Sequence, residues 1–200
     1  LLFNRAVTSN DGQSSVDGFD DGGNAIPAEM LPSEIDYRGV SFDLGPTTGG
    51  QLNAVACEGQ QVLLPTGPYG RLYLLAAAAN GDQVTTFLID GEEVRLTIQD
   101  WGGYVGQWDN RIWEGGITEV AFNWPWAYLG LEPAYIRRDP IAWFSSHRHT
   151  SSGGNSSYDY AYLFVYAIDL PPGATTLTLP DNDKVHVMAM TAANDPGADT

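Results

Sequence analysis

Two of the three histidines in this chain, His147 and His149, stand two positions apart in the segment AWFSSHRHTSSGGNSSY. Residues two apart on a strand share a face, so both rings are expected to point the same way. Such a pair can hold zinc or copper if a third or fourth ligand joins it, and His186 and the many carboxylates are possible donors. Alternatively, these side chains donate hydrogen bonds to sugar hydroxyls or to a neighbouring domain, or they end a strand with Arg148 paired to an acid. We favour a sugar or a neighbouring domain over a metal, and all three alternatives stay open.

A second candidate site is an acidic, glycine-rich segment near the N-terminus, VDGFDDGGN. Calcium takes six to eight oxygen ligands, and carboxylates held in tight turns supply them. The spacing is not that of an EF-hand loop. The alternative is an exposed turn cluster, because Asp, Asn and Gly are common in turns. The candidate calcium ligands in this segment are Asp17, Asp20, Asp21 and Asn24.

The aromatic residues suggest a third kind of site. The chain of 200 residues has a high aromatic content, with six Trp, ten Tyr and seven Phe. Many of them lie in QDWGGYVGQWDNRIWEGG and AFNWPWAYLG. Sugar rings stack their apolar C–H face on Trp and Tyr, and exposed aromatic groups of this kind mark binding surfaces. The alternative is that the Trp residues cap the core. The candidate carbohydrate-binding residues are Trp101, Tyr104, Trp108, Asp109, Asn110, Arg111, Trp113, His147 and His149.

Sequence signatures of catalysis are missing. The chain has no G-x-S-x-G elbow, H-E-x-x-H motif, P-loop or dinucleotide-binding fingerprint. Carboxylate pairs for glycoside hydrolysis can be drawn from Asp100, Asp109 and Glu114, but any acidic protein offers such pairs. A serine triad around His147 would have to combine distant parts of the chain. We therefore predict that the protein is not an enzyme, and a small metalloenzyme using His147 and His149 is the least favoured hypothesis.

The charge balance excludes some partners. There are 25 acids and 9 bases, which gives a formal charge of −16. Binding to nucleic acid or to an anionic membrane surface needs a basic footprint, so neither is expected as a partner. No apolar run is long enough to cross a bilayer. The single cysteine, Cys57, rules out an internal disulfide and is expected to be a buried small hydrophobic residue.

Glycine and proline are spread along the chain between short runs rich in β-branched and aromatic residues, the pattern of an all-β protein. The Asp-Gly pair between Val84–Asp90 and Glu93–Gln99 predicts a tight hairpin. The other expected strands are Val40–Leu44, Leu52–Cys57, Gln61–Leu64, Arg71–Ala79, Thr118–Asn123, Ala142–His149, Tyr158–Leu170, Thr175–Leu179 and Lys184–Ala192.

The run Tyr158–Leu170 alternates in side-chain direction, yet neither of its faces is polar in the middle. It is expected to be a central strand covered on both faces. The following DLPPGATTLTLP is typical of the penultimate hairpin of a jelly-roll sandwich. We therefore predict an all-β fold, a jelly-roll β-sandwich, with one domain over residues 1–192 and the start of a linker at 193–200.

Three stretches resemble a known type of module: VDGFDDGGNAIPAEMLPSEIDYRGVSFDLG, GQQVLLPTGPYGRLYLLAAAANGD and DLPPGATTLTLPDNDKVHVMAMTAA. They are similar to galactose-binding-like β-sandwich accessory modules of bacterial glycoside hydrolases, above all the non-catalytic module of bacterial α-mannosidases. The resemblance implies a carbohydrate-binding or enzyme-supporting role and a structural calcium ion. That ion would lie in the acidic loop, completed by an acid near the last strand such as Asp181 or Asp183.

The leading hypothesis is a secreted bacterial carbohydrate-binding module that tethers a glycoside hydrolase in the same chain to its polysaccharide, which raises the enzyme's local concentration there. The alternative is a structural accessory domain that packs on the catalytic domain and binds no sugar. A monomer is expected in either case.

Overall fold

The computed structural model describes residues 1–103, 108–109, 135–136 and 139–194. The chain divides into two compact units, residues 1–103 with 139–200 and residues 104–138. In the second unit the described backbone is a short antiparallel pair, β11 (Trp108–Asp109) with β12 (Tyr135–Ile136). The expected strand Thr118–Asn123 lies outside the described residues. The predicted single domain with a linker from residue 193 stays a prediction.

The larger sheet of the first unit is antiparallel throughout and contains the path β10-β14-β7-β16-β5. β13 also pairs with β14, along the edge opposite β7. Its centre is apolar: seven consecutive residues, Leu72–Ala78, are buried in β7. Residues 161–166 of β14 are also all buried, which confirms the prediction of a central strand covered on both faces. The strands are β5 (Val55–Glu58), β7 (Arg71–Ala78), β10 (Gly102–Gly103), β13 (Ile141–His149), β14 (Asn155–Asp169) and β16 (Asp181–Ala193).

The second sheet has the order β6-β15-β8-β9 and is also antiparallel. In β8, Thr85, Phe87 and Ile89 are buried while the residues between them are more exposed, so one face meets the core. The predicted hairpin is confirmed, because Asp90 and Gly91 join β8 and β9 with φ angles of 48° and 92°. The strands are β6 (Gln61–Leu63), β8 (Gln83–Ile89), β9 (Glu92–Ile98) and β15 (Thr176–Thr178).

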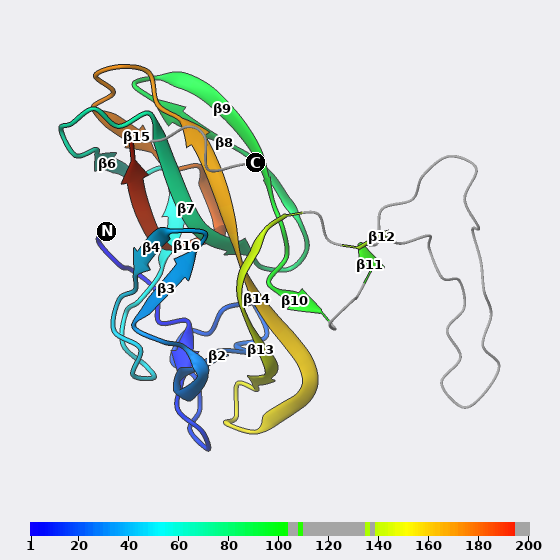
Figure 1. Cartoon of the computed structure of the whole chain (residues 1–200). Coiled ribbons are helices and arrows are strands. Elements are labelled where there is room, and N and C mark those ends of the chain that lie inside the picture. Colours follow the sequence, from blue (N-terminus) through cyan, green and yellow to red (C-terminus); the bar gives the residue numbers. More distant parts are fainter. Residues whose placement is uncertain (104–107, 110–134, 137–138, 195–200) are drawn as a thin grey trace, which may run out of the picture. The chain divides into compact units, whose positions relative to one another are not determined.

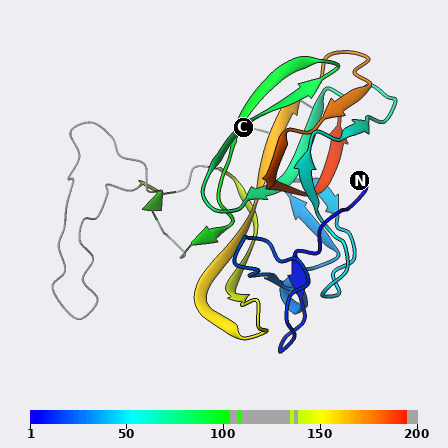
Figure 2. The ribbon, with the colours of Figure 1, turned by 180° about the vertical axis from the view of Figure 1, so that it is seen from behind.

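The two sheets pack face to face, as Figures 1 and 2 show from opposite sides. Buried side chains from both, such as Phe87 of β8 and Phe164 of β14, belong to one hydrophobic cluster. The predicted all-β sandwich is therefore confirmed. The described part of the chain has one short 3₁₀ helix, η1 (Ala28–Met30), and none of its helices is long and apolar enough to span a membrane.

The N-terminal segment crosses the end of the sandwich where β13 and β14 extend beyond the other strands (Figure 1). β1 (Thr8–Ser9) pairs in parallel with β2 (Ile26–Pro27), and η1 follows β2 directly. Next to β2, Ala25 exchanges both backbone hydrogen bonds with His149, at 2.8 and 3.0 Å. A hairpin of β3 (Glu34–Tyr37) and β4 (Val40–Asp43) comes next. These pairings bring η1 beside the end of β13.

The pairing of β13 with β14 is interrupted by a bulge. His147 faces Ser157 and Ser145 faces Ala161, so β14 has more residues than β13 between these two pairs. Tyr158 lies in the extra length and adopts a left-handed φ of 64°. The predicted strand began at Tyr158, whereas β14 begins at Asn155, because its first residues pair with the histidine segment rather than with the core strands.

Candidate functional site

Glu29, His147 and His149 come together at the end of β13, and we call them the histidine–glutamate cluster. Their ligand atoms, two imidazole nitrogens and one carboxylate oxygen, all lie within 4.8 Å of one another. Glu29 Oε1 is 3.1 Å from Nε2 of His149 and 3.7 Å from Nε2 of His147. The two ring centroids are 5.5 Å apart, as expected for residues on one face of a strand. Among the described residues, this group alone has the composition and spacing of a metal site.

His149 is held in place from behind. Its side chain is fully buried, and its Nδ1 lies 3.0 Å from Ser9 Oγ and 3.1 Å from the Ser9 carbonyl oxygen. When Nε2 of His149 carries the ring proton, the Ser9 hydroxyl can donate a hydrogen bond to Nδ1. When Nδ1 carries the proton, the Ser9 carbonyl oxygen can accept one from it. Ser9 therefore supports either tautomer and fixes the ring so that Nε2 faces Glu29.

A pocket of about 330 Å³ with a mixed polar and apolar lining, the bulge pocket, lies beside His147 at the β13–β14 bulge. Tyr158, with 71% of its surface exposed, forms part of the wall. Hydroxyl, amide, imidazole and phenol groups all border the same hollow, a combination suited to a hydroxylated ligand. Its lining residues are Ser146, His147, Asn155, Ser157, Tyr158 and Tyr160.

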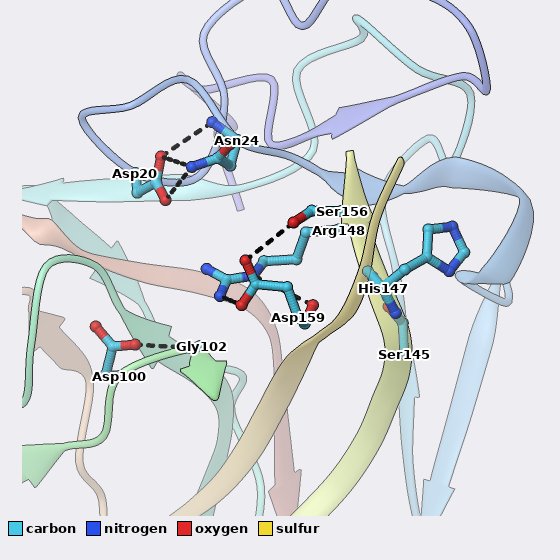
Figure 3. Close-up of polar contacts among 9 residues, drawn as sticks. All are labelled: Asp20, Asn24, Asp100, Gly102, Ser145, His147, Arg148, Ser156 and Asp159. Carbon is cyan, nitrogen blue, oxygen red and sulfur yellow. Dashed lines mark hydrogen bonds and ion pairs between the residues drawn. The ribbon is translucent and has the colours of Figure 1, made fainter. Parts of the chain in front are cut away.

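Arg148 points away from His147, as Figure 3 shows, and has a structural role. Its guanidinium forms an ion pair with Asp159, whose other carboxylate oxygen accepts a 3.3 Å hydrogen bond from Ser156. It also lies 4.7 Å from the ring centroid of Trp101. The sequence-based interpretation that Arg148 pairs with an acid is confirmed.

Trp101 is not available to a ligand, and its assignment as a sugar-stacking residue is wrong. The side chain is only 1% exposed, with Phe19 stacked at 4.5 Å between ring centroids and Arg148 also packed against the ring. For Trp101 the alternative interpretation, a Trp that caps the core, is the one that the structure bears out. The neighbouring Asp100 accepts a 2.7 Å hydrogen bond from the Gly102 N–H and so braces the backbone (Figure 3).

Tyr104, Asn110, Arg111 and Trp113 lie outside the described residues. For Trp108 and Asp109 the structure describes the backbone pairing of β11 with β12.

The acidic loop has carboxylates that face different partners. Asp17 accepts a 2.8 Å hydrogen bond from the Ala6 N–H, and Asp20 accepts two from the Asn24 side chain, at 3.2 and 2.9 Å, and one from its backbone N–H (Figure 3). Asp21 forms a 2.6 Å ion pair with Lys184, and this hydrogen bond lowers the pKa of Asp21.

Asp183, the acid expected to complete a calcium site, contributes its backbone carbonyl, which accepts a 3.1 Å hydrogen bond from His186. The contacts of Asp17, Asp20 and Asp21 account for the shape of the loop, and a calcium ion there stays a prediction.

Glu29 is the functional candidate that sequence reasoning missed. It is 120 positions from His149, and EMLPSEID has no metal-binding spacing. Glu29 comes close to the two histidines because β1 pairs with β2 and Ala25 pairs with His149. No local sequence pattern indicates this tertiary arrangement.

The fold found here agrees with a comparison against known families. Residues 1–196 match the family described as the AziU2-like beta-sandwich domain. The chain belongs to the AziU2-like β-sandwich family. A search of curated proteins finds no match. Membership supports the β-sandwich part of the resemblance to galactose-binding-like modules and shows no link to glycoside hydrolases.

Proposed function

We propose that this AziU2-like domain is a non-catalytic carbohydrate-binding module, and that its sugar site is the bulge pocket. The observation that carries the proposal is the composition of the pocket wall. Two tyrosines lie beside Asn155, Ser146, Ser157 and His147 around a hollow of about 330 Å³. Pyranose rings offer an apolar face to aromatic rings and a rim of hydroxyls to such polar groups, so this wall suits a sugar better than it suits a purely apolar ligand.

The backbone of Tyr158 supports this assignment. A left-handed φ of 64° in a non-glycine residue costs energy, and residues held in such conformations cluster at binding sites. The bulge also re-aims the side chain out of the ladder, where 71% of the residue is exposed. A strained and exposed tyrosine contributes little to the core, so ligand contact is a physical reason for it to be there.

The module would be secreted from a bacterium as a monomer, with a glycoside hydrolase in the same chain that it tethers to polysaccharide. Among the described residues, those that line the bulge pocket include no carboxylate, so this part of the wall does not supply a pair of acids for glycoside hydrolysis.

The test is retention of the purified protein on a panel of soluble and insoluble polysaccharides, with Tyr158→Asn as the critical variant. Asparagine tolerates a left-handed φ and therefore removes the ring without adding strain. Loss of one stacked ring is worth about 0.5–1.5 kcal/mol, so binding should weaken by roughly two- to tenfold.

Phe144→Asn is the matched control, because Phe144 is a 54% exposed aromatic on β13 that does not line the pocket. It should bind as the unmodified protein does. Equal binding by the Tyr158 variant would place the sugar elsewhere, and no retention on any glycan would contradict the proposal.

A second candidate function is the structural accessory domain, and one surface favours it. A mostly apolar pocket of about 420 Å³ lies at β6, where Leu2, Val62 and Leu63 form part of the wall. Leu2 and Leu63 are 93% and 79% exposed beside this hollow, and apolar side chains grouped on a surface mark an interaction site. Failure of all glycans to bind would leave this function as the better proposal.

A further inference from the structure

We infer that the histidine–glutamate cluster binds one divalent transition-metal ion, and that zinc is the ion that its ligands suit best. The inference goes beyond sugar binding and does not depend on it. Two imidazole nitrogens and one carboxylate oxygen make a ligand set found in zinc sites that keep a further position for water. Calcium and magnesium prefer oxygen ligands alone, so they fit this set poorly.

The two distances from the Glu29 oxygen to the imidazole nitrogens are close to those of such an ion's ligands. With bonds of about 2.0–2.1 Å in a tetrahedron, neighbouring ligand atoms stand about 3.3 Å apart. The Glu29 oxygen is 3.1 Å from Nε2 of His149 and 3.7 Å from Nε2 of His147. All three ligand atoms lie within 4.8 Å of one another, so forming such a site takes a shift of a few tenths of an ångström in the exposed Glu29 side chain and a closer approach of the two imidazole nitrogens.

The hydrogen bonding around the cluster favours a ligand at His147. Nε2 of His147 is buried and has no hydrogen-bond partner in the described part of the protein. A buried polar atom without a partner is destabilising, so such atoms call for an explanation. A metal ion between this nitrogen and Glu29 would satisfy it.

Ser9 supplies the support that metal-binding histidines need. When the Ser9 carbonyl accepts the Nδ1–H of His149, the Nε2 lone pair is left facing the carboxylate, and a cation between the two is then favourable. Metal-ligating histidines characteristically donate their other N–H to a carbonyl or a carboxylate in this way. The backbone pairing of His149 with Ala25 holds the ring in register.

The cluster is also accessible. The Glu29 side chain is 45% exposed, and His147 forms part of the wall of the bulge pocket. An ion can therefore enter from solvent, and a water molecule completes its fourth position. The formal charge of −16 favours the approach of a cation to the molecule.

The test is titration of the whole chain, without a histidine tag and stripped with EDTA, with zinc chloride in an isothermal calorimeter. Cobalt(II) serves as a spectroscopic probe, since it gives strong visible absorption when bound in a tetrahedral site. We expect one zinc ion per chain. Changing a supporting residue behind a metal ligand costs 10–100-fold in affinity, so removing a ligand in Glu29→Gln or His147→Gln should cost at least about 100-fold.

Glu34→Gln is the matched control, because Glu34 is exposed on β3 and its hydrogen bond from Ser41 can be kept by an amide oxygen. It should bind zinc as the unmodified protein does, and far-ultraviolet circular dichroism checks that each variant is folded. Absence of stoichiometric zinc binding, or equal binding by folded Glu29 and His147 variants, would overturn the inference. No sugar is present in this experiment, so its failure is distinct from failure of the proposed function.

Discussion

At the scale of single residues, the most instructive case is Trp101. Its segment is rich in glycine and polar residues, which suggested an exposed stacking platform. In the structure the Trp101 backbone N–H donates to the Ala78 carbonyl at 2.8 Å. The backbone N–H of Tyr162 donates to the Trp101 carbonyl at 2.7 Å. These contacts continue the larger sheet and bury the indole against Phe19. The residues next to a tryptophan in the sequence therefore do not predict on which side of the sheet its ring lies.

We predict that Trp101→Ala lowers the free energy of unfolding by about 3–5 kcal/mol, the usual cost of removing a buried large aromatic side chain. Urea denaturation followed by circular dichroism measures this change. Phe144→Ala, at an exposed position, should change the stability by less than about 1 kcal/mol. A Trp101 variant as stable as the Phe144 variant would contradict the burial of the indole.

At the scale of elements, the β8–β9 hairpin is the feature whose local sequence agrees best with the structure. Asp90 does more than form the turn, because its carboxylate accepts hydrogen bonds from the Thr175 and Thr176 hydroxyls, at 2.8 and 2.9 Å. These bonds lower the pKa of Asp90 and tie the turn to β15 of the same sheet. The hairpin is thus fixed both by its own turn and by the neighbouring strand.

We expect Gly91→Ala to lower the free energy of unfolding by roughly 1–2 kcal/mol, because a side chain at a left-handed φ meets the carbonyl oxygen that follows it. Gly91 has a φ of 92°. Gly91→Asn serves as the comparison, since asparagine tolerates positive φ better. Thermal unfolding measures both, and equal melting temperatures for the two variants would argue against backbone strain as the cause.

At the scale of the whole molecule, acid stability depends on His186, which is 1% exposed. Burial lowers the pKa of this imidazole to about 3, with the positive charges of Arg5 and Lys184 acting in the same direction. The carbonyl of Asp183, which accepts the ring N–H, and the carboxylate of Asp21 oppose the shift. The folded protein therefore keeps His186 neutral where the unfolded chain takes up a proton.

The sign of the pH dependence follows from this difference. The unfolded imidazole has a pKa of 6.5 and the folded one about 3, so the unfolded state gains a proton first as the pH falls, and stability is lost between these values. From pH 7 to pH 5 this one group should cost about 2 kcal/mol. His186→Gln, which keeps an N–H donor but cannot titrate, should show a loss smaller by that amount in urea unfolding. The same loss in both proteins would show that His186 is not the group responsible.

The strand assignments follow from local chemistry, and most of them are confirmed to within one to three residues. Turn residues, β-branched runs and the alternation of Tyr158–Leu170 determine extended backbone and burial without reference to distant residues. Strands β1, β2 and β3 were missed at this level, whereas β4 (Val40–Asp43) agrees with the predicted strand Val40–Leu44. A two-residue strand carries no alternation, and its pairing exists only because another segment lies beside it.

The sequence by itself determined that this protein is an all-β sandwich, that His147 and His149 face the same way, and that its charge disfavours anionic partners. Those properties depend on residue type and on a period of two along a strand. Only the tertiary structure decided that Glu29 joins the histidines and that Trp101 is buried. Both outcomes depend on contacts between residues more than 75 positions apart in the chain, such as Ala25 with His149 and Phe19 with Trp101. Such contacts depend on how the whole chain packs, and no local pattern contains that information.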